Sequence, residues 1–366
     1  MKWTSIVTSQ GQLHRQWTDN IEVLYTGLHG LSVQRFRLKE NGQSYIYKPF
    51  ATAADVMREL RVYRQIMPWL PEVYPQLIAY SAGTITETPE TDRVQASMHT
   101  SIQPSPGSTH SGCWLILEDI GELNHRHTEQ VLLEMAELIA QWHRIPLANI
   151  AELPVQGQKP PLSVVREEVL QHWEQAIQLL SRSVQESSIS SAGKGSNQSR
   201  SHLPDQQQLN RLQADLLHFQ PDTASVLSHG DLHAGNYGMN PQGRLIVLDW
   251  EHAHAALPYW DLYHLLDMSH PLFPRRMNRT LRRLVLQRYV QSNCQQRDPG
   301  KGRSLDSSEF YRDYYRFAIL YSLWMLLLIE RDLQQPKALW PHSQLLAQRR
   351  ETIEHLLQCI EEWSGL

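Results

Sequence analysis

The chain has 366 residues, three cysteines and a formal net charge of −4 at pH 7. This length favours two lobes or domains over one small core. The mildly negative charge argues against a general nucleic-acid binder, and the widely spaced cysteines argue against a disulfide framework or a paired-cysteine zinc site.

The N-terminal residues lack the apolar run of a signal peptide, which favours the reducing cytoplasm. The longest apolar stretch, Phe317–Ile329, is too short to cross a bilayer and is predicted to be a core helix. We therefore expect a cytoplasmic protein with neither a membrane nor a nucleic acid as its partner. The composition indicates no oligomeric state.

Short runs of β-branched and aromatic residues predict a small N-terminal sheet. The expected strands are Ile21–Thr26, Val33–Leu38, Ser44–Lys48, Gln76–Tyr80 and Trp114–Glu118. Asn41-Gly42 is typical of a hairpin turn. A helix is expected over Ala53–Met67, where apolar residues recur at helical spacing before Pro68.

Two segments are rich in small polar residues. Residues 81–111 are predicted to form a long surface loop, and residues 181–201 a disordered insertion. Beyond Glu118 the chain becomes mainly helical, with one β-type interruption at about 225–249. The expected helices lie near 128–144, 162–180, 206–219, 259–268, 275–293, 308–333 and 342–364. The sequence thus predicts an α+β protein with a β-rich N-terminal lobe and a larger helical C-terminal lobe.

The segment HGDLHAGN, residues 229–236, carries the clearest chemical pattern. It is predicted to be a loop, followed by a hairpin whose second strand ends at Asp249. This order would bring Asp231, Asn236 and Asp249 together. Phosphoryl transfer needs such a set: one carboxylate for the acceptor hydroxyl, for which Asp231 is the candidate, and oxygen ligands for Mg²⁺, which Asn236 and Asp249 can supply.

HGDLHAGN, the following LDWE, and then Pro258 and Asp261-Leu262 resemble the aminoglycoside phosphotransferase and choline kinase superfamily. The resemblance implies a protein-kinase-like fold that uses ATP and Mg²⁺. Its nucleotide-binding lobe would be residues 1–118, and its catalytic and acceptor-binding lobe residues 119–366. It also implies Asp231 as the catalytic base, Asn236 and Asp249 as Mg²⁺ ligands, and Asp261 as a brace for the loop.

Two other interpretations of this segment remain. HGDLH could be an ordinary turn, and its histidines could indicate a metal hydrolase. The hydrolase is disfavoured because a zinc site usually shows a helical HExxH pair or a cysteine set.

Lys48 lies in an apolar-aromatic strand, where a lysine is commonly only a solvated residue. In the kinase order, however, the third strand carries the lysine that binds the α- and β-phosphates. Glu59 lies at the edge of the apolar face of the next helix, where a carboxylate needs a cation. We therefore predict that Lys48 binds phosphate and that Glu59 is its partner.

Two further nucleotide contacts are less specific. The glycines and serine of Thr26–Ser32 would suit a phosphate-binding loop or a plain hairpin turn equally well. The kinase order places the adenine-binding hinge at Leu117–Ile120, with contacts from the main chain of Glu118 and Ile120.

No APE motif follows Asp249, which favours a small acceptor over a protein. The resemblance allows aminoglycosides, amino alcohols, amino-acid hydroxyls or sugars as acceptors. Our main hypothesis is an ATP- and Mg²⁺-dependent phosphotransferase acting on a small-molecule hydroxyl. The rival hypothesis is a catalytically silent kinase-like scaffold, such as a spore-coat-type protein.

Overall fold

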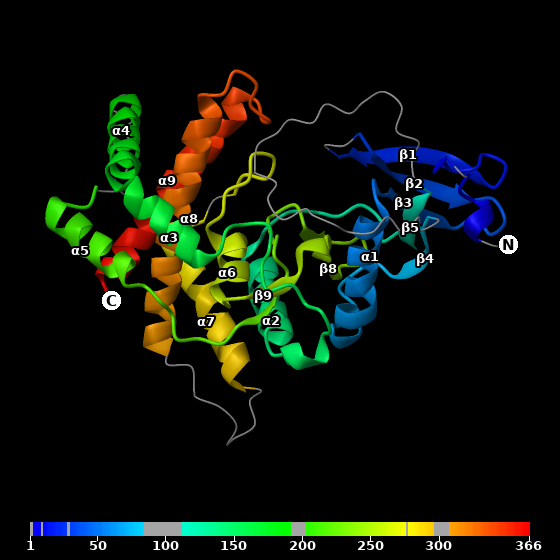
Figure 1. Ribbon diagram of the computed structural model, residues 1–366, viewed down its shortest axis with the longest axis horizontal. Helices are drawn as coiled ribbons and strands as arrows, with labels where there is room; N and C mark the ends of the chain where they lie inside the picture. Colours follow the sequence, from blue (N-terminus) through cyan, green and yellow to red (C-terminus); the bar gives the residue numbers. More distant parts are fainter. Residues whose placement is uncertain are drawn as a thin grey trace, which may run out of the picture. The chain divides into compact units, whose positions relative to one another are not determined.

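The computed structural model describes residues 3–8, 10–27, 30–83, 112–191, 203–275, 277–295 and 307–366. The chain divides into two compact units, Met1–Glu122 and Leu123–Leu366. The first is built on one sheet, and the second is mainly helical (Figure 1).

The first unit contains a five-stranded antiparallel sheet with the strand order β1-β2-β3-β5-β4. Its strands are β1 (Thr18–Thr26), β2 (Ser32–Leu38), β3 (Ser44–Pro49), β4 (Leu77–Ala82) and β5 (Cys113–Glu118). All five predicted strands are therefore present. The Asn41-Gly42 turn is also confirmed, because Gly42 has a φ of 69° and the Asn41 side chain accepts a hydrogen bond from the amide of Gln43.

Different segments of the chain pack on the two faces of this sheet. The N-terminal segment packs on one face, with Ile6 and Leu13 against Tyr47. Helix α1 (Ala53–Arg61) packs on the other, with Val56 and Leu60 in its core. Tyr47 lies on the sheet face that the N-terminal segment covers. Successive strand residues point to opposite faces of a sheet, so Lys48 lies on the face that α1 covers.

Helix α1 is shorter than predicted. The side chain of Thr52 caps its first turn by accepting from the amide of Asp55. The α-helix ends at Arg61, and a wider π turn (Val62–Ile66) and a 3₁₀ turn (Met67–Trp69) follow. Pro68 lies in that last turn and prevents a regular continuation.

The second unit combines helices with two small antiparallel sheets, β6-β9 and β7-β8. Its helices are α2 (Glu129–Trp142), α3 (Leu162–Gln171), α4 (Trp173–Ser191), α5 (Gln206–Leu217), α6 (Tyr259–Leu266), α7 (Arg279–Gln295), α8 (Ser307–Leu333) and α9 (His342–Ser364). Its strands are β6 (Val226–Ser228), β7 (Tyr237–Met239), β8 (Leu245–Val247) and β9 (His254–Ala256).

Two predictions for this unit are wrong. The single helix expected over 162–180 is broken at His172 into α3 and α4. The insertion expected to be disordered from residue 181 is helical as far as Ser191. Buried Trp173, Ala176 and Leu180 anchor the start of α4, and extending an anchored helix costs little compared with nucleating one. Residues 192–201 and most of the predicted loop 81–111 lie outside the described residues.

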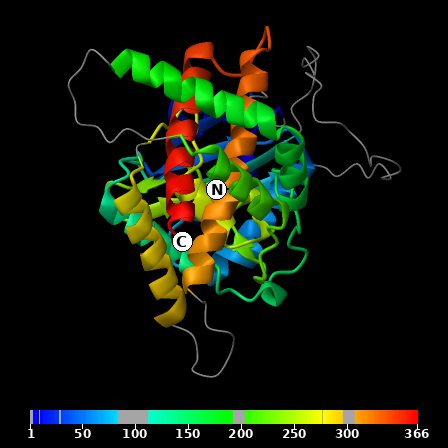
Figure 2. The same cartoon turned by 90° about the vertical axis from the view of Figure 1, so that its left-hand side faces the viewer.

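Helices α8 and α9 run side by side, and α4 crosses them (Figure 2). Phe317–Ile329 lies in α8 and is buried at most positions, so the predicted core helix is confirmed. Across the described ranges, no helix combines the length and the apolar character that a membrane span requires.

A buried ion pair joins the helices of this unit. Asp267 follows α6 and accepts two hydrogen bonds from Arg282 of α7, at 2.9 and 2.7 Å. Its other carboxylate oxygen accepts from the hydroxyl of Tyr314 on α8, and its main-chain carbonyl lies 3.3 Å from a ring nitrogen of His355 on α9. Asp267 and Arg282 are both 0% exposed. One carboxyl-bearing residue thus contacts three helices.

We predict that Asp267→Ala will lower the free energy of unfolding by about 3–5 kcal/mol, because it leaves the Arg282 charge buried without its carboxylate. Urea denaturation followed by circular dichroism measures this loss. The matched control is Asp19→Ala, which removes the exposed partner of Arg37 and should cost about 0–1 kcal/mol. Equal losses in the two variants would contradict the structural role of Asp267.

Candidate active site

The predicted site residues fall in both units: Lys48, Glu59, Glu118 and Ile120 in the first, and Asp231, Asn236 and Asp249 in the second. The loop 229–236 connects β6 to β7. Strand β6 pairs with β9, and β7 pairs with β8. One pair of strands therefore holds the start of the loop, and a different pair holds its end.

Asp261, in the first turn of the buried helix α6, fixes the start of this loop. One of its carboxylate oxygens accepts from the amide of His229 at 3.0 Å, and the other accepts from the hydroxyl of Ser228 at 2.7 Å and the amide of Gly230 at 3.4 Å. From α2, Trp142 donates to the same carboxylate at 2.9 Å, and a ring nitrogen of His143 lies 3.1 Å away. A single buried side chain thus sets the main-chain path immediately before Asp231.

The pKa of Asp261 reflects these contacts. Burial by itself would raise it, but the hydrogen bond and charge of His143, followed by His229 and Ser228, hold the pKa below its ordinary value of 3.8. The carboxyl group is therefore ionised at neutral pH.

Two glycines allow the loop to pass close to its neighbours. Gly230 has a φ of 85°, and a Cβ there would lie 2.1 Å from the carbonyl oxygen of His252. At Gly235 a Cβ would lie 2.3 Å from the ring of Phe273. Position 230 thus has no room for a side chain, and a side chain at position 235 would require the Phe273 ring to move.

His229 connects the loop to Leu248, the residue directly after β8. Its Nε2 donates to the carbonyl of Leu248 at 2.7 Å, and its Nδ1 accepts from the amide of Asp231 at 3.3 Å. Burial lowers the pKa of this imidazole, so the ring is neutral and both contacts fit one tautomer. His233 accepts from the amide of Gly235 in a similar way. These bonds give the histidines structural tasks within the loop and weaken the metal-hydrolase interpretation.

The Asp231 side chain is 24% exposed and can therefore be reached by a substrate. Its main-chain carbonyl accepts from the side-chain amide of Asn236 at 2.8 Å. His233 Nε2 lies 3.7 Å from one carboxylate oxygen of Asp231, and His264 Nδ1 lies 3.9 Å from the other. The Asp231 carboxylate is thus flanked by imidazoles.

The register of the β7-β8 pair brings Asn236 and Asp249 to the same end of the hairpin. Tyr237 pairs with Val247, and the amide of Leu248 donates to the carbonyl of Asn236 at 2.7 Å. Asp249 then adopts a left-handed conformation with a φ of 56° and a ψ of 54°. Such strain in a residue other than glycine costs on the order of 1–3 kcal/mol and is concentrated at functional sites.

The donor chemistry of Asn236 and Asp249 fits Mg²⁺. The amide nitrogen of Asn236 is used by the Asp231 carbonyl, so its oxygen is the end that can face a cation. An amide oxygen and a carboxylate are hard ligands, and Mg²⁺ commonly takes only one or two protein ligands beside water and phosphate oxygens. The two residues could therefore hold this ion.

In the first unit, Lys48 of β3 and Glu59 of α1 form an ion pair with an N–O distance of 2.7 Å. Their side chains are 18% and 8% exposed. The Lys48 ammonium also lies 5.4 Å from the centre of the Phe50 ring. The pair is thus partly buried on the sheet face that α1 covers, and the direction of the lysine is restricted.

The predicted hinge, Leu117–Ile120, covers the last two residues of β5 and the two residues after it. The amide of Glu118 already donates to the carbonyl of Gln76 at 2.9 Å, so this donor would not serve an adenine ring. Ile120 lies in a turn that Asp119 stabilises by accepting from Gly121 at 3.0 Å and from Arg35 at 2.9 Å. The hinge segment therefore has a defined path.

The glycine-containing turn between β1 and β2 is a hairpin turn at its described ends. The amide of Gly27 donates to Leu31, and the amide of Gly30 donates to Gly27. A cavity of about 340 Å³ touches Gly30–Ser32 and Tyr47, but Lys48 does not line it. These contacts favour the plain-turn alternative, while Leu28 and His29 lie outside the described residues.

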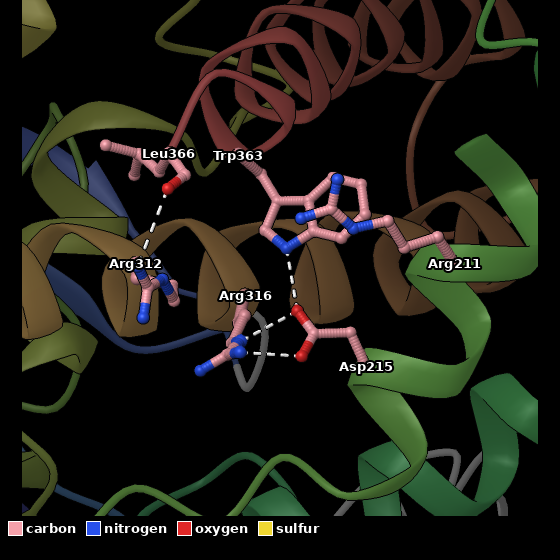
Figure 3. A pocket seen from close by; sticks show the side chains of 6 residues that line it. All are labelled: Arg211, Asp215, Arg312, Arg316, Trp363 and Leu366. Carbon is pink, nitrogen blue, oxygen red and sulfur yellow. Dashed lines mark hydrogen bonds and ion pairs between the residues drawn. The ribbon is translucent and has the colours of Figure 1, made fainter.

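A second cavity, of about 390 Å³, lies among α5, α8 and α9 in the helical unit (Figure 3). Its charged groups largely satisfy one another: Arg316 donates to both oxygens of Asp215, the Trp363 indole donates to the same carboxylate, and Arg211 stacks on that indole. None of the predicted site residues lines this cavity.

Sequence reasoning missed the groups that surround Asp231 and Asp261. Trp142 and His143 lie at the end of an apolar helix, and His264 lies in a helix that is buried on every side. No spacing distinguishes such residues from ordinary core residues, so only the tertiary contacts identify them.

A family model described as the phosphotransferase enzyme family matches residues 26–303. The chain therefore belongs to the phosphotransferase enzyme family. A comparison with curated protein sequences finds no match.

Solved structures are similar over nearly the whole chain. A putative aminoglycoside phosphotransferase from Ralstonia eutropha JMP134 has a TM-score of 0.50 at 14% identity, covering 96% of each chain. A choline kinase from Cryptosporidium parvum Iowa II has a TM-score of 0.48 at 12% identity, covering 99% of this chain and 94% of that one. A macrolide 2′-phosphotransferase from Brachybacterium faecium has a TM-score of 0.42 at 15% identity, covering 93% of each. The predicted kinase-like α+β fold is confirmed.

We predict that Asp261→Asn will lower the free energy of unfolding by about 3 kcal/mol at pH 7, because an amide nitrogen replaces an acceptor among buried donors. The pKa of Asp261 is lowered in the folded state, so its contribution is present above the ordinary value of 3.8 and is lost as the pH falls below it. Chemical denaturation of the wild type and of Asp261→Asn between pH 7 and pH 3 measures the difference in their free energies of unfolding. A difference between them that does not shrink at low pH would contradict the assignment.

Proposed function

We propose that the protein is an ATP- and Mg²⁺-dependent phosphotransferase that phosphorylates a hydroxyl group of a small molecule. The observation that carries the proposal is the arrangement of the second unit's loop and hairpin. The loop holds the accessible carboxylate of Asp231 five residues before Asn236, whose side chain donates to the Asp231 carbonyl. The main-chain carbonyl of Asn236 in turn accepts a hydrogen bond from the amide of Leu248, the residue before Asp249. Family membership supports the same reaction class.

In this proposal Asp231 orients the acceptor hydroxyl and receives its proton. The acceptor oxygen forms a bond to the γ-phosphorus, the bond between that phosphorus and the bridging oxygen breaks, and ADP leaves with the electron pair. Lys48, directed by Glu59, would bind the α- and β-phosphates, and the main chain near Glu118 and Ile120 would contact the adenine. Mg²⁺ bound by Asn236 and Asp249 would offset the negative charge of the phosphates.

The length of the segment after Asp249 favours a small acceptor. Only one 3₁₀ turn (Trp250–His252) and β9 separate Asp249 from α6, which begins at Tyr259. A protein kinase places its peptide-binding activation segment after the corresponding aspartate. The short connection leaves no room for one. The cytoplasmic location expected from the sequence stays a prediction.

We predict that Asp231→Asn will lower kcat on the order of 10²–10⁴-fold while the affinity for Mg·ATP changes little, because the amide cannot accept the hydroxyl proton. ATP consumption over a panel of hydroxylated metabolites and antibiotics measures the first effect, and calorimetric titration measures the second. Wild-type turnover in the variant would contradict the assignment of Asp231. Mg·ATP binding without turnover on any acceptor would instead favour the scaffold hypothesis.

For the Lys48–Glu59 pair we predict a higher KM for ATP, a lower kcat, or both in Lys48→Ala, and a smaller defect of the same kind in Glu59→Gln. The double variant should be less than additive, because the two side chains act through one ion pair. Steady-state kinetics of the four proteins measure the coupling. Full additivity together with normal ATP affinity in both single variants would remove the pair from the nucleotide site.

A further inference from the structure

Helix α6 contacts the loop that carries Asp231 through several side chains. The indole of Trp260 donates to the carbonyl of Gly230 at 3.3 Å, and the carboxylate of Asp261 accepts from the amide of Gly230 at 3.4 Å. His264 lies three residues after Asp261, and residues three apart share one face of a helix. The face of α6 that fixes the main chain before Asp231 therefore also presents an imidazole to the loop.

The imidazole of His264 is enclosed by the protein. It is 0% exposed, and neither of its ring nitrogens has a hydrogen-bond partner among the described residues. Its ring centre lies 4.7 Å from that of Trp260, and burial lowers its pKa well below 6.5, so the ring is neutral. An enclosed polar group without a partner destabilises a fold, because it loses its hydrogen bonds to water and gains none. We therefore expect this side chain to serve something other than the packing of the core.

The Asp231 carboxylate lies just out of reach of this imidazole. Nδ1 of His264 is 3.9 Å from one carboxylate oxygen, about 1 Å beyond the usual length of a hydrogen bond. The other carboxylate oxygen lies 3.7 Å from Nε2 of His233. Hydrogen bonds at catalytic groups are often long in a free enzyme and shorten when the substrate is bound. A movement of the carboxylate by about 1 Å would complete the bond to His264.

The two imidazoles beside Asp231 differ in what holds them. His233 belongs to the loop itself, and its side chain is 14% exposed. His264 belongs to the buried helix α6, and its main-chain carbonyl accepts from Arg275 at 2.8 Å. A bond from His264 would therefore fix the Asp231 carboxylate against an element outside the loop, as Asp261 fixes the main chain.

We propose that His264 is a positioning residue for Asp231: its Nδ1–H donates to one oxygen of the carboxylate and leaves the other to receive the proton of the acceptor hydroxyl. The inference rests on the proposed function and adds a residue to its site. His264 itself is enclosed and acts only through Asp231.

The test compares stability with turnover in His264→Leu, which keeps a side chain of similar size and removes its polar atoms. Hydrolysis of Mg·ATP, with water in place of the acceptor, gives kcat and the KM for ATP. The kcat should fall about 10- to 100-fold, the effect of one hydrogen bond to a charged group, while the KM stays as in wild type. The urea midpoint should stay the same or rise, because an unpaired polar group leaves the interior.

His264→Asn and His264→Gln separate the donor from the volume of the side chain. The amide nitrogen of asparagine is attached to Cγ, as Nδ1 is in histidine, whereas that of glutamine lies one bond further, near the place of Nε2. His264→Asn should therefore recover most of the kcat that His264→Leu loses, and His264→Gln should not. Equal kcat values in these two variants would overturn the proposal.

The matched control is His355→Leu in α9. His355 is 1% exposed, but its Nδ1 lies 3.3 Å from the main-chain carbonyl of Asp267. This variant should show the opposite pattern, with a lower urea midpoint and the kcat of wild type. A wild-type kcat in His264→Leu, or a urea midpoint lowered as much as in His355→Leu, would overturn the role of His264.

NMR of the ring nitrogens separates this inference from the proposed function, because it needs no turnover. The signals of His264 are those absent from the spectrum of His264→Leu. In wild type the proton should reside on Nδ1, and Asp231→Ala should weaken that preference. A proton on Nε2 in an active wild-type enzyme would overturn the positioning role. An Nδ1 proton that depends on Asp231, in a wild-type protein that consumes no ATP with any acceptor, would reject the proposed function and keep the contact.

Discussion

The buried carboxylate of Asp261 accepts hydrogen bonds from the main-chain amides at the start of the loop that carries Asp231. It also links that loop to the end of α2 through Trp142 and His143. Because the carboxylate is ionised and wholly enclosed, moving any of these donors would leave a buried charge incompletely solvated. The position of Asp231 is therefore set by a residue that has no need to touch a substrate.

Within each unit, a single short contact also orients other polar groups. A single bond between the main chains of Asn236 and Leu248 fixes the approach to Asp249, which then takes a strained left-handed conformation. In the sheet unit, strand alternation and the position of α1 bring Lys48 and Glu59 into contact. In both units the secondary structure sets the position of the polar residue, Asp249 in one and Lys48 in the other. One short contact then sets its orientation.

The Asp231 carboxylate lies near imidazoles from two different parts of the second unit, His233 of the loop and His264 of α6. Burial and nearby positive charge keep His233, His264 and His270 neutral, so they offer hydrogen bonds without charge.

The sequence by itself determined the kinase-like α+β fold, the five strands, the core helix around Phe317–Ile329 and the segment from which Asp231 and Asp249 come. These features rest on periodicity, turn residues and motif spacing, which are local. It missed β9 and wrongly expected disorder at residues 181–191, because short paired strands and helix extension depend on distant packing partners. Only the tertiary structure decided that His264 lies near Asp231 and that Trp142 and His143 contact Asp261, since contacts between buried helices leave no periodic trace in the sequence.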